Sequence, residues 1–163
     1  MAAFSIRAVG EADRAWIGPY LSRHRSSPAI ATRGRLLRAD ELPGFVAEAV
    51  GVAVGLLTMR VEGDACAVVT LNSEREGEGI GTALLAAAIA KACEASLGRL
   101  FLVTTNDNLH AIRFYRRRGL ALRAVYARSI EALRLLKPEI AQTGFHGIPI
   151  RDGIEFELVL RRT

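Results

Sequence analysis

The sequence has no apolar run that approaches the roughly 18 residues of a membrane-spanning helix. Its longest apolar run, Ala83–Ala90, is rich in alanine and falls within a helical pattern. Residues 1–13 show no basic stretch followed by an apolar one, so no signal peptide is expected. These absences argue against a membrane protein or a secreted one, and they predict a cytoplasmic location.

Residues that bind metals or form disulfides are also scarce. The two cysteines, Cys66 and Cys93, have apolar neighbours in the sequence, which predicts buried free thiols in a reducing compartment rather than a disulfide. The three histidines, His24, His110 and His146, do not stand at metal-ligand spacing from the cysteines. We therefore expect no metal site.

The chain has 163 residues, of which half are hydrophobic, so we expect a single domain over residues 1–163. Its formal net charge of +5 favours anionic partners such as nucleic acid, an acidic surface or a phosphorylated small molecule. The only concentrated basic run is "RFYRRRG", residues 113–119. Because this run lacks aromatic stacking positions interleaved with its basic residues and matches no recognised motif, we expect no nucleic-acid partner.

Hydrophobic periodicity divides the chain into strands and helices. Alternation predicts half-buried strands, whereas the nearly continuous apolar run Leu100–Thr105 predicts burial on both faces, as in a parallel pair. The expected strands are residues 4–8, 44–50, 51–63, 64–71, 100–105, 120–126 and 154–160. The expected helices are residues 11–17, 20–24, from the glycines to about 96, 108–119 and 129–137, with a loop over 25–34. This order predicts an α/β fold with a mixed sheet of about seven strands, antiparallel at first and locally parallel at its centre, flanked by helices.

Three glycines at alternate positions, Gly77, Gly79 and Gly81, open directly into the helix after the third meander strand. The first turn of a helix has backbone N–H groups with no partner inside the helix, at the positive end of its dipole. Glycines there let an anion approach the backbone, and Thr82 adds a hydroxyl donor. The pattern predicts a phosphate or pyrophosphate site, with a tight turn that binds nothing as the alternative.

Two common phosphate motifs do not fit. A P-loop needs a lysine followed by Ser or Thr after its last glycine, but Thr82 follows Gly81 directly. A dinucleotide fingerprint needs a third glycine where Thr82 stands, and an acidic residue after the next strand, which ends in "TTN" instead.

The segments "EGEGIG" (76–81) and "NLHAIRFYRRRGL" (108–120) together resemble the GNAT superfamily of acyl-CoA-dependent N-acyltransferases. The first lies on the Arg/Gln-x-x-Gly-x-Gly/Ala frame, with Gly79 and Gly81 matched. The second matches Asn-x-x-Ala, Tyr and Gly through Asn108, Ala111, Tyr115 and Gly119. Glu76 replaces the Arg or Gln of the frame, and Leu120 replaces the usual Phe. The resemblance covers nearly the whole chain.

The resemblance implies that acetyl-CoA lies where the strands over 64–71 and 100–105 splay apart. Its pantetheine arm would pair with backbone from Val69 to Leu71 and bond Asn108, whose plain structural role is a helix cap. Its pyrophosphate would bind N–H groups of the turn. The implied cosubstrate-binding residues are Val69, Leu71, Glu76, Gly77, Gly79, Ile80, Gly81, Thr82, Asn108 and Tyr115. One or two arginines of the basic run would approach the 3′-phosphate, although a solvated helix face explains each of them as well.

Tyr115 is the residue that the resemblance assigns to chemistry, as the general acid that protonates the leaving CoA thiolate. The implied function is direct acetyl transfer from acetyl-CoA to a primary amine of a small molecule or peptide, an acyltransferase reaction of the EC 2.3.1 type. A non-catalytic acyl-CoA-binding member of the same fold is the alternative. A homodimer is possible.

The general base and the acceptor stay open. The third meander strand has no carboxylate, so Glu48, Asp152 and Glu155 are candidates for the base, as is bulk solvent. Acceptor specificity is expected in the loops over 23–42 and 137–153. The irregular segment Lys137–Phe156 is interpreted as a substrate-side wall or an oligomer contact.

Overall fold

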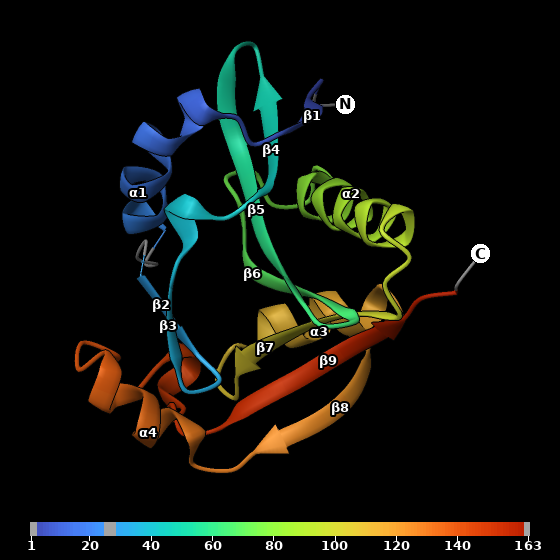
Figure 1. Cartoon of the computed structure of the whole chain (residues 1–163). Coiled ribbons are helices and arrows are strands. Elements are labelled where there is room, and N and C mark those ends of the chain that lie inside the picture. The colour runs from blue at the N-terminus through green and yellow to red at the C-terminus, as the bar shows by residue number, and fades with distance from the viewer. Residues whose placement is uncertain (1–2, 25–28, 162–163) are drawn as a thin grey trace. The chain divides into compact units, whose positions relative to one another are not determined.

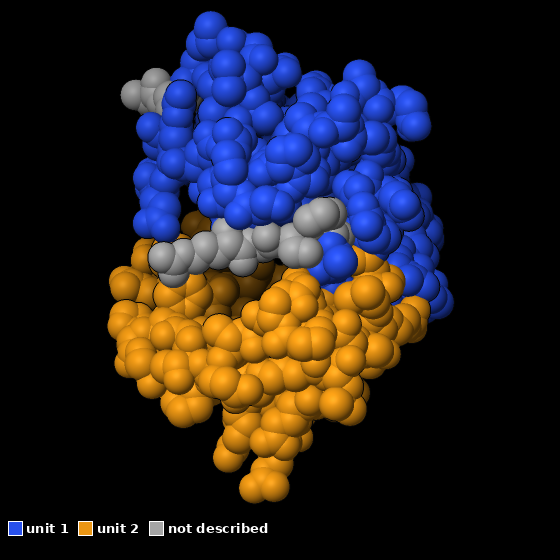
Figure 2. Space-filling model, turned by 90° about the vertical axis from the view of Figure 1, so that its left-hand side faces the viewer, with its two compact units in different colours: residues 1–30, 38–100, 160–163 blue, residues 31–37, 101–159 orange. Residues whose placement is uncertain are grey.

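The structure, a computed structural model, describes residues 3–24 and 29–161. The chain divides into two compact units, coloured separately in Figure 2. The first unit holds residues 1–30, 38–100 and 160–163, and the second holds residues 31–37 and 101–159. Seven strands of the described residues belong to a mixed sheet. The predicted α/β class with about seven strands is therefore confirmed.

The first unit is built on an antiparallel meander. Its strands β1 (Ser5–Ala8), β4 (Gly44–Ala49), β5 (Val52–Glu62) and β6 (Ala65–Ser73) pair in this order, each antiparallel to its neighbour. The hairpin between β4 and β5 turns at Val50 and Gly51, with φ of 50° and 74°. The three strands predicted over 44–71 are confirmed.

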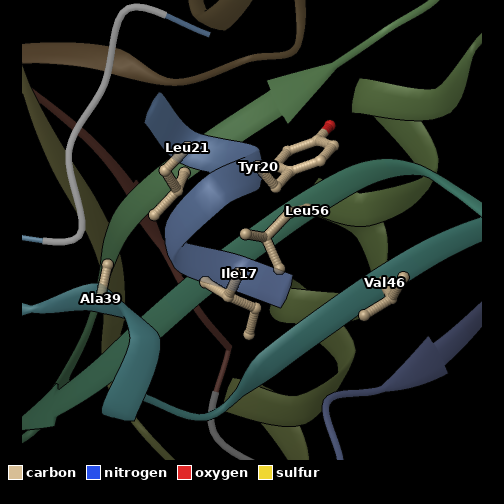
Figure 3. Close-up of a cluster of buried hydrophobic side chains, with 6 residues drawn as sticks. All are labelled: Ile17, Tyr20, Leu21, Ala39, Val46 and Leu56. Carbon is tan, nitrogen blue, oxygen red and sulfur yellow. The ribbon is translucent and has the colours of Figure 1, made fainter. Parts of the chain in front are cut away.

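Two helices lie on opposite faces of these strands, α1 (Arg14–Arg23) and α2 (Ile80–Glu94) (Figure 1). Figure 3 shows the cluster under α1, in which its buried side chains pack with Val46 of β4 and Leu56 of β5. The buried face of α2 consists of Ile80, Leu84, Leu85, Ala88 and Ala92. Because side chains alternate along β5, Leu56 faces α1 while Gly55 faces α2.

The strands of the second unit have the order β7-β9-β8, with β8 antiparallel to β9. They are β7 (Arg99–Thr105), whose first two residues belong to the first unit, β9 (Gly153–Val159) and β8 (Ala121–Tyr126). Its helices are α3 (Leu109–Arg117) and α4 (Ser129–Leu136). The irregular segment 137–152 is fixed by hydrogen bonds. Arg134 of α4 donates to the carbonyls of Ile140, Ala141 and Ile150, and Asn106 bonds Pro149, Arg151 and Asp152.

The structure corrects three expectations. The helices expected over 11–17 and 20–24 form a short 3-10 turn (Glu11–Asp13) and one helix α1 that contains Pro19, because Ile17 and Tyr20 on either side of the proline pack into the same core. The expected loop over 25–34 holds β2 (Ala29–Thr32), which pairs with β3 (Arg35–Arg38), while residues 25–28 lie outside the described residues.

The third correction concerns Cys93. Both cysteines are free thiols, as predicted, but only Cys66 is buried. Cys93 lies on the exposed side of α2, next to Ala92 on the buried side, so its apolar neighbours in the sequence are not its neighbours in space.

A buried carboxylate connects β1 to the start of α1. The guanidinium of Arg7 donates to both oxygens of Asp13, from Nη1 at 2.7 Å and from Nη2 at 2.8 Å. Asp13 also accepts from the Gly10 N–H at 2.7 Å and from Trp16 Nε1 at 2.8 Å. These donors, Arg7 above all, hold the pKa of Asp13 far below its usual value although the side chain is buried.

Asp13→Asn should destabilise the chain at neutral pH, by about 1.5–3 kcal/mol, because the buried side chain loses its charge-assisted hydrogen bonds from the half-exposed Arg7. A carboxyl group with a lowered pKa stabilises the folded state above the unfolded pKa and loses that effect as the pH falls. The difference between wild type and variant should therefore shrink below about pH 5. Urea unfolding at several pH values measures it.

The matched control is Asp40→Asn, which breaks the more exposed contact of Asp40 with Arg38 at 2.7 Å. Such pairs contribute little to stability. If Asp13→Asn unfolded at the same urea concentration as this control at pH 7, the link between β1 and α1 would not depend on charge.

Candidate functional site

A bulge distorts β6 at the position where the sequence predicts ligand contacts. Leu71 pairs with Leu57 and Thr70 with Thr58, but the next pair joins Met59 to Val68. Val69 is therefore the extra residue of a bulge, a feature found next to many active sites. Nothing in the alternation of residues 64–71 predicts it.

The side chains beside the bulge form a fixed frame. The hydroxyls of Thr58 and Thr70 are both buried and lie 2.7 Å apart, within hydrogen-bond distance. Val69 and Leu71, which flank Thr70, are half-buried. The backbone of residues 69–71, predicted to pair with a ligand, is thus supported from one side by a buried polar pair.

The glycine turn joins the end of β6 to the start of α2. All of its residues, 74–79, are exposed. Gly77 and Gly79 have φ of 79° and 82°, and a Cβ atom at either would meet no atom within 4 Å. These positions require glycine for their backbone conformation, and the space around them is open.

Helix α2 begins at this turn without a side-chain cap. Gly79 is its N-cap residue, and no side-chain hydrogen bond caps the helix. The first backbone bond inside the helix runs from the Ala83 N–H to the Gly79 carbonyl at 3.0 Å. The N–H groups of Ile80, Gly81 and Thr82 precede that bond, so they belong to the set that a helix cannot satisfy by itself. The result is an exposed helix N-terminus suited to an anion.

The charged side chains of the turn mostly bind protein partners. Arg75 lies 3.7 Å from Glu78, and its N–H donates to the Ser73 hydroxyl. Glu74 lies 3.3 Å from His24 and 3.9 Å from Arg23, both at the end of α1. Glu76 is exposed. Since the only basic residue of the turn is engaged with Glu78, an anion here would bind chiefly to backbone N–H groups.

Gly55 determines how closely α2 approaches the sheet. A Cβ at this position would lie 2.6 Å from Ile80 Cγ2 and 3.0 Å from Leu84 Cδ1. Any side chain would therefore push the first turn of α2 away from β5. Sequence reasoning missed this residue, although a single glycine inside a strand is a known sign of close packing.

In the second unit, the motif residues Asn108 and Tyr115 lie on α3. Asn108 caps the helix, since its Oδ1 accepts from the Ala111 N–H at 3.1 Å, and the predicted cap is confirmed. Gly119 follows the helix with a φ of 87°. Of the basic run, Arg118 packs over the Phe114 ring at 3.6 Å, while Arg116 and Arg117 are exposed.

Tyr115 is a buried residue, at 8% exposure. Its ring packs edge-on against Phe114 at 5.3 Å and lies 6.5 Å from Phe156 of β9. Burial raises the pKa of the Tyr115 phenol above its usual value, because the charged phenolate is poorly solvated there. The phenol therefore keeps its proton at neutral pH, as a proton donor must.

The three candidates for the base have different surroundings. Glu48 of β4 lies 3.5 Å from Arg7. Asp152 accepts from the Arg151 guanidinium and from the Arg128 N–H, which lowers the pKa of Asp152 and weakens it as a base. Glu155 of β9 is buried and accepts from the Tyr126 hydroxyl at 2.8 Å.

The predicted residues thus fall into two groups. Val69, Leu71 and residues 76–82 lie on one continuous path from β6 through the turn into α2, in the first unit. Asn108 and Tyr115 lie about two turns apart on α3, in the second unit.

In the part of the chain that the structure describes, no group of three or more His, Cys, Asp or Glu residues is arranged to hold a metal ion. None of the described helices is long and apolar enough to cross a membrane.

Comparison of the sequence with known proteins identifies the family that the motifs of residues 76–81 and 108–120 resemble. The model of the acetyltransferase (GNAT) family matches residues 11–120. The chain is 41% identical over 142 residues to the uncharacterised protein YdhI of Bacillus subtilis (strain 168), an alignment that covers 86% of this chain and 89% of YdhI.

Solved structures share the fold. An IAA acetyltransferase from Bacillus cereus ATCC 14579 matches with a TM-score of 0.75 at 17% identity, over 97% of this chain and 100% of that one. The structure of yncA, a putative acetyltransferase from Salmonella typhimurium with its cofactor acetyl-CoA, matches with a TM-score of 0.68 at 20% identity, over 99% and 96% of the two chains.

Gly55→Ala should destabilise the chain by about 1–3 kcal/mol, because the added methyl group overlaps Ile80 in a packed core. Urea unfolding measures the loss. Gly10→Ala is the control, since a Cβ at Gly10 meets its nearest atom at 3.7 Å, an ordinary contact. Equal stability of the two variants would mean that α2 packs less closely on β5 than described.

Proposed function

Because the chain belongs to the acetyltransferase (GNAT) family, we propose that it transfers an acetyl group from acetyl-CoA directly to a primary amine of a small molecule or peptide. The observation that carries this proposal is the open glycine turn at the N-terminus of α2, which offers backbone donors to a pyrophosphate. A non-catalytic acyl-CoA-binding role for the same site is the second candidate, favoured by Glu76 in place of a basic or amide residue.

The proposed contacts with the cosubstrate are assigned to each group of residues in turn. Backbone N–H groups of residues 76–82 and the Thr82 hydroxyl bind the pyrophosphate. The pantetheine arm pairs with the backbone of Val69 and Leu71 beside the bulge, as an added strand does. Asn108 serves the same arm with the donors of its amide, while its oxygen caps α3. The exposure of Glu76 supports this assignment, because its carboxylate has room to stay away from the phosphates.

In the proposed reaction, the amine nitrogen attacks the carbonyl carbon of the thioester, the C–S bond breaks, and the nitrogen loses a proton to a base or to bulk solvent. Tyr115 then gives its proton to the departing sulfur. Its raised pKa supports this role, because the phenol is protonated at every pH at which an acetyl transfer is normally measured.

Transfer without an acyl-enzyme intermediate is supported by the state of the cysteines. Burial raises the pKa of Cys66 to about 11, so little reactive thiolate exists at neutral pH. Cys93 lies in the last turn of α2, at the opposite end of that helix from the glycine turn. A single domain, a cytoplasmic location and a possible homodimer stay predictions.

Acetyl-CoA should stabilise the chain against thermal unfolding. At about 100 times its dissociation constant, the ligand should add about 2.7 kcal/mol, a rise of a few degrees in Tm. Gly79→Asp should abolish this rise, since it places a carboxylate where the pyrophosphate binds. Differential scanning fluorimetry with and without acetyl-CoA measures both.

Gly63→Asp is the matched control for Gly79→Asp. Gly63 lies in the turn between β5 and β6, also has a positive φ of 57°, and also faces open space. Both variants should lose similar stability from the left-handed backbone, about 1–2 kcal/mol. If acetyl-CoA raised the Tm of Gly79→Asp as much as that of Gly63→Asp, the glycine turn would be only a turn.

Tyr115→Phe should lower kcat by about 10²–10⁴-fold, or about 3–5 kcal/mol, because the general acid is lost while the packing is kept. Its acetyl-CoA affinity and Tm should stay close to those of wild type. Steady-state release of CoA thiol in the presence of an amine measures kcat. Equal kcat in the two proteins would assign Tyr115 to packing alone.

A further inference from the structure

Glu155 is a carboxylate placed where carboxylates are rare. It lies within β9 and is 2% exposed, between Ile154 and Phe156. Burying a charged group in a sheet is unfavourable unless it is bonded, and such groups are concentrated at functional sites. The Tyr126 hydroxyl of β8 donates to Glu155 Oε1 at 2.8 Å. Packing alone therefore does not explain why a carboxylate and a tyrosine are paired at this position.

The pair lies on the sheet face opposite Tyr115. In the β8–β9 register, Tyr126 pairs with Gly153 and Ala124 with Glu155, so these side chains share a face. Phe156, the next residue, points the other way and approaches the Tyr115 ring. Two proton-exchanging groups thus flank the same strand, one on each face.

Residues of β7 and the β2–β3 turn lie on the same face as Glu155. The Val103 side chain is beside Gly153, and Phe101, two residues earlier, shares its face. The guanidinium of Arg33, in the β2–β3 turn, lies over the Phe101 ring at 4.9 Å. Charged or titratable residues that these contacts and the alternation of β9 place on this face are Arg33, Tyr126 and Glu157, the last of which lies 3.7 Å from Arg123.

Tyr126 connects the buried carboxylate to the surface. The residue is 38% exposed, whereas Glu155 is almost fully buried. A phenol can donate one proton while it accepts another. A proton that reaches the Tyr126 oxygen can therefore be passed on to Glu155 without exposing the carboxylate.

We propose that the Tyr126–Glu155 pair takes the proton of the acceptor amine, an inference that rests on the proposed function. The ammonium form of the amine first gives a proton to the Tyr126 oxygen, as the Tyr126 hydroxyl gives its own to Glu155. The neutral nitrogen then attacks the carbonyl carbon, the C–S bond breaks, and the nitrogen loses its second proton to solvent. Tyr115 supplies the separate proton that the sulfur takes. Both sites exchange protons with solvent between turnovers, which restores the starting state.

The other two candidates are less suited to this role. Asp152 forms hydrogen bonds with Arg151 and with the Arg128 backbone, which stabilise its charged form. Glu48 lies beside Arg7 on β4, next to β1. Placing the base on the face opposite the acid also keeps the two proton transfers apart, so that Tyr115 does not simply protonate the base.

The test compares two small nucleophiles with different needs for a base. Methylamine is almost fully protonated at neutral pH, whereas hydroxylamine is largely unprotonated. Glu155→Gln keeps an oxygen for the Tyr126 hydroxyl but accepts no proton. It should lower kcat/KM for methylamine about 10²-fold and change that for hydroxylamine only a few-fold. Tyr126→Phe should show the same difference. Release of CoA thiol from acetyl-CoA is the readout.

Glu157→Gln is the matched control, since Glu157 lies on the same strand, 3.7 Å from Arg123, and should behave as wild type with both nucleophiles. An equal loss with both nucleophiles in Glu155→Gln would assign a structural role to the pair, and no loss with either would make it a bystander. A wild-type protein that releases no thiol with either nucleophile contradicts the proposed function, and the inference about Glu155 with it. The Tm and the acetyl-CoA-induced shift of each variant show that it folds and binds.

Discussion

The backbone N–H groups in the first turn of α2, which precede the first hydrogen bond inside the helix, are the feature on which the rest of the site depends. They require a turn that leaves them open, which Gly77 and Gly79 provide through their left-handed backbone. They require α2 to lie close to the sheet, which Gly55 permits. They also require β6 to end at that point, and the bulge at Val69 changes the pairing of β6 with β5 just before the turn. Together these features direct one helix dipole at one exposed position.

The proposed chemistry depends on the burial of titratable side chains more than on charged residues beside them. Tyr115 stays protonated because the interior disfavours its anion, and Cys66 is kept unreactive for the same reason. Glu155 is buried as well, but Tyr126 connects it to the surface. The chain thus places a proton donor and a proposed proton acceptor on opposite faces of β9.

Much of this site could be predicted from the sequence because its signals are local. The alternate glycines before an apolar helix indicate a turn with positive φ angles. Asn108, three residues before Ala111, indicates a helix cap. The features that were missed depend on contacts between distant segments. The bulge at Val69 appears only in the register with β5, and the exposure of Cys93 depends on which side of α2 meets the sheet. Similarly, the burial that keeps α1 continuous through Pro19 comes from β4 and β5.

The central claim, direct acetyl transfer from acetyl-CoA to an amine, is tested most directly with acetyl-CoA labelled by deuterium in its acetyl group. The chain is mixed with this donor and a panel of tyramine, spermidine, lysine and methylamine, and the products are followed by mass spectrometry. The account predicts labelled acetyl on the nitrogen of at least one amine, free CoA in equal amount, and no labelled protein during turnover. A labelled protein that forms and decays as product appears would contradict direct transfer. Binding of acetyl-CoA without any labelled amine would contradict the enzymatic function and favour the role of an acyl-CoA-binding protein.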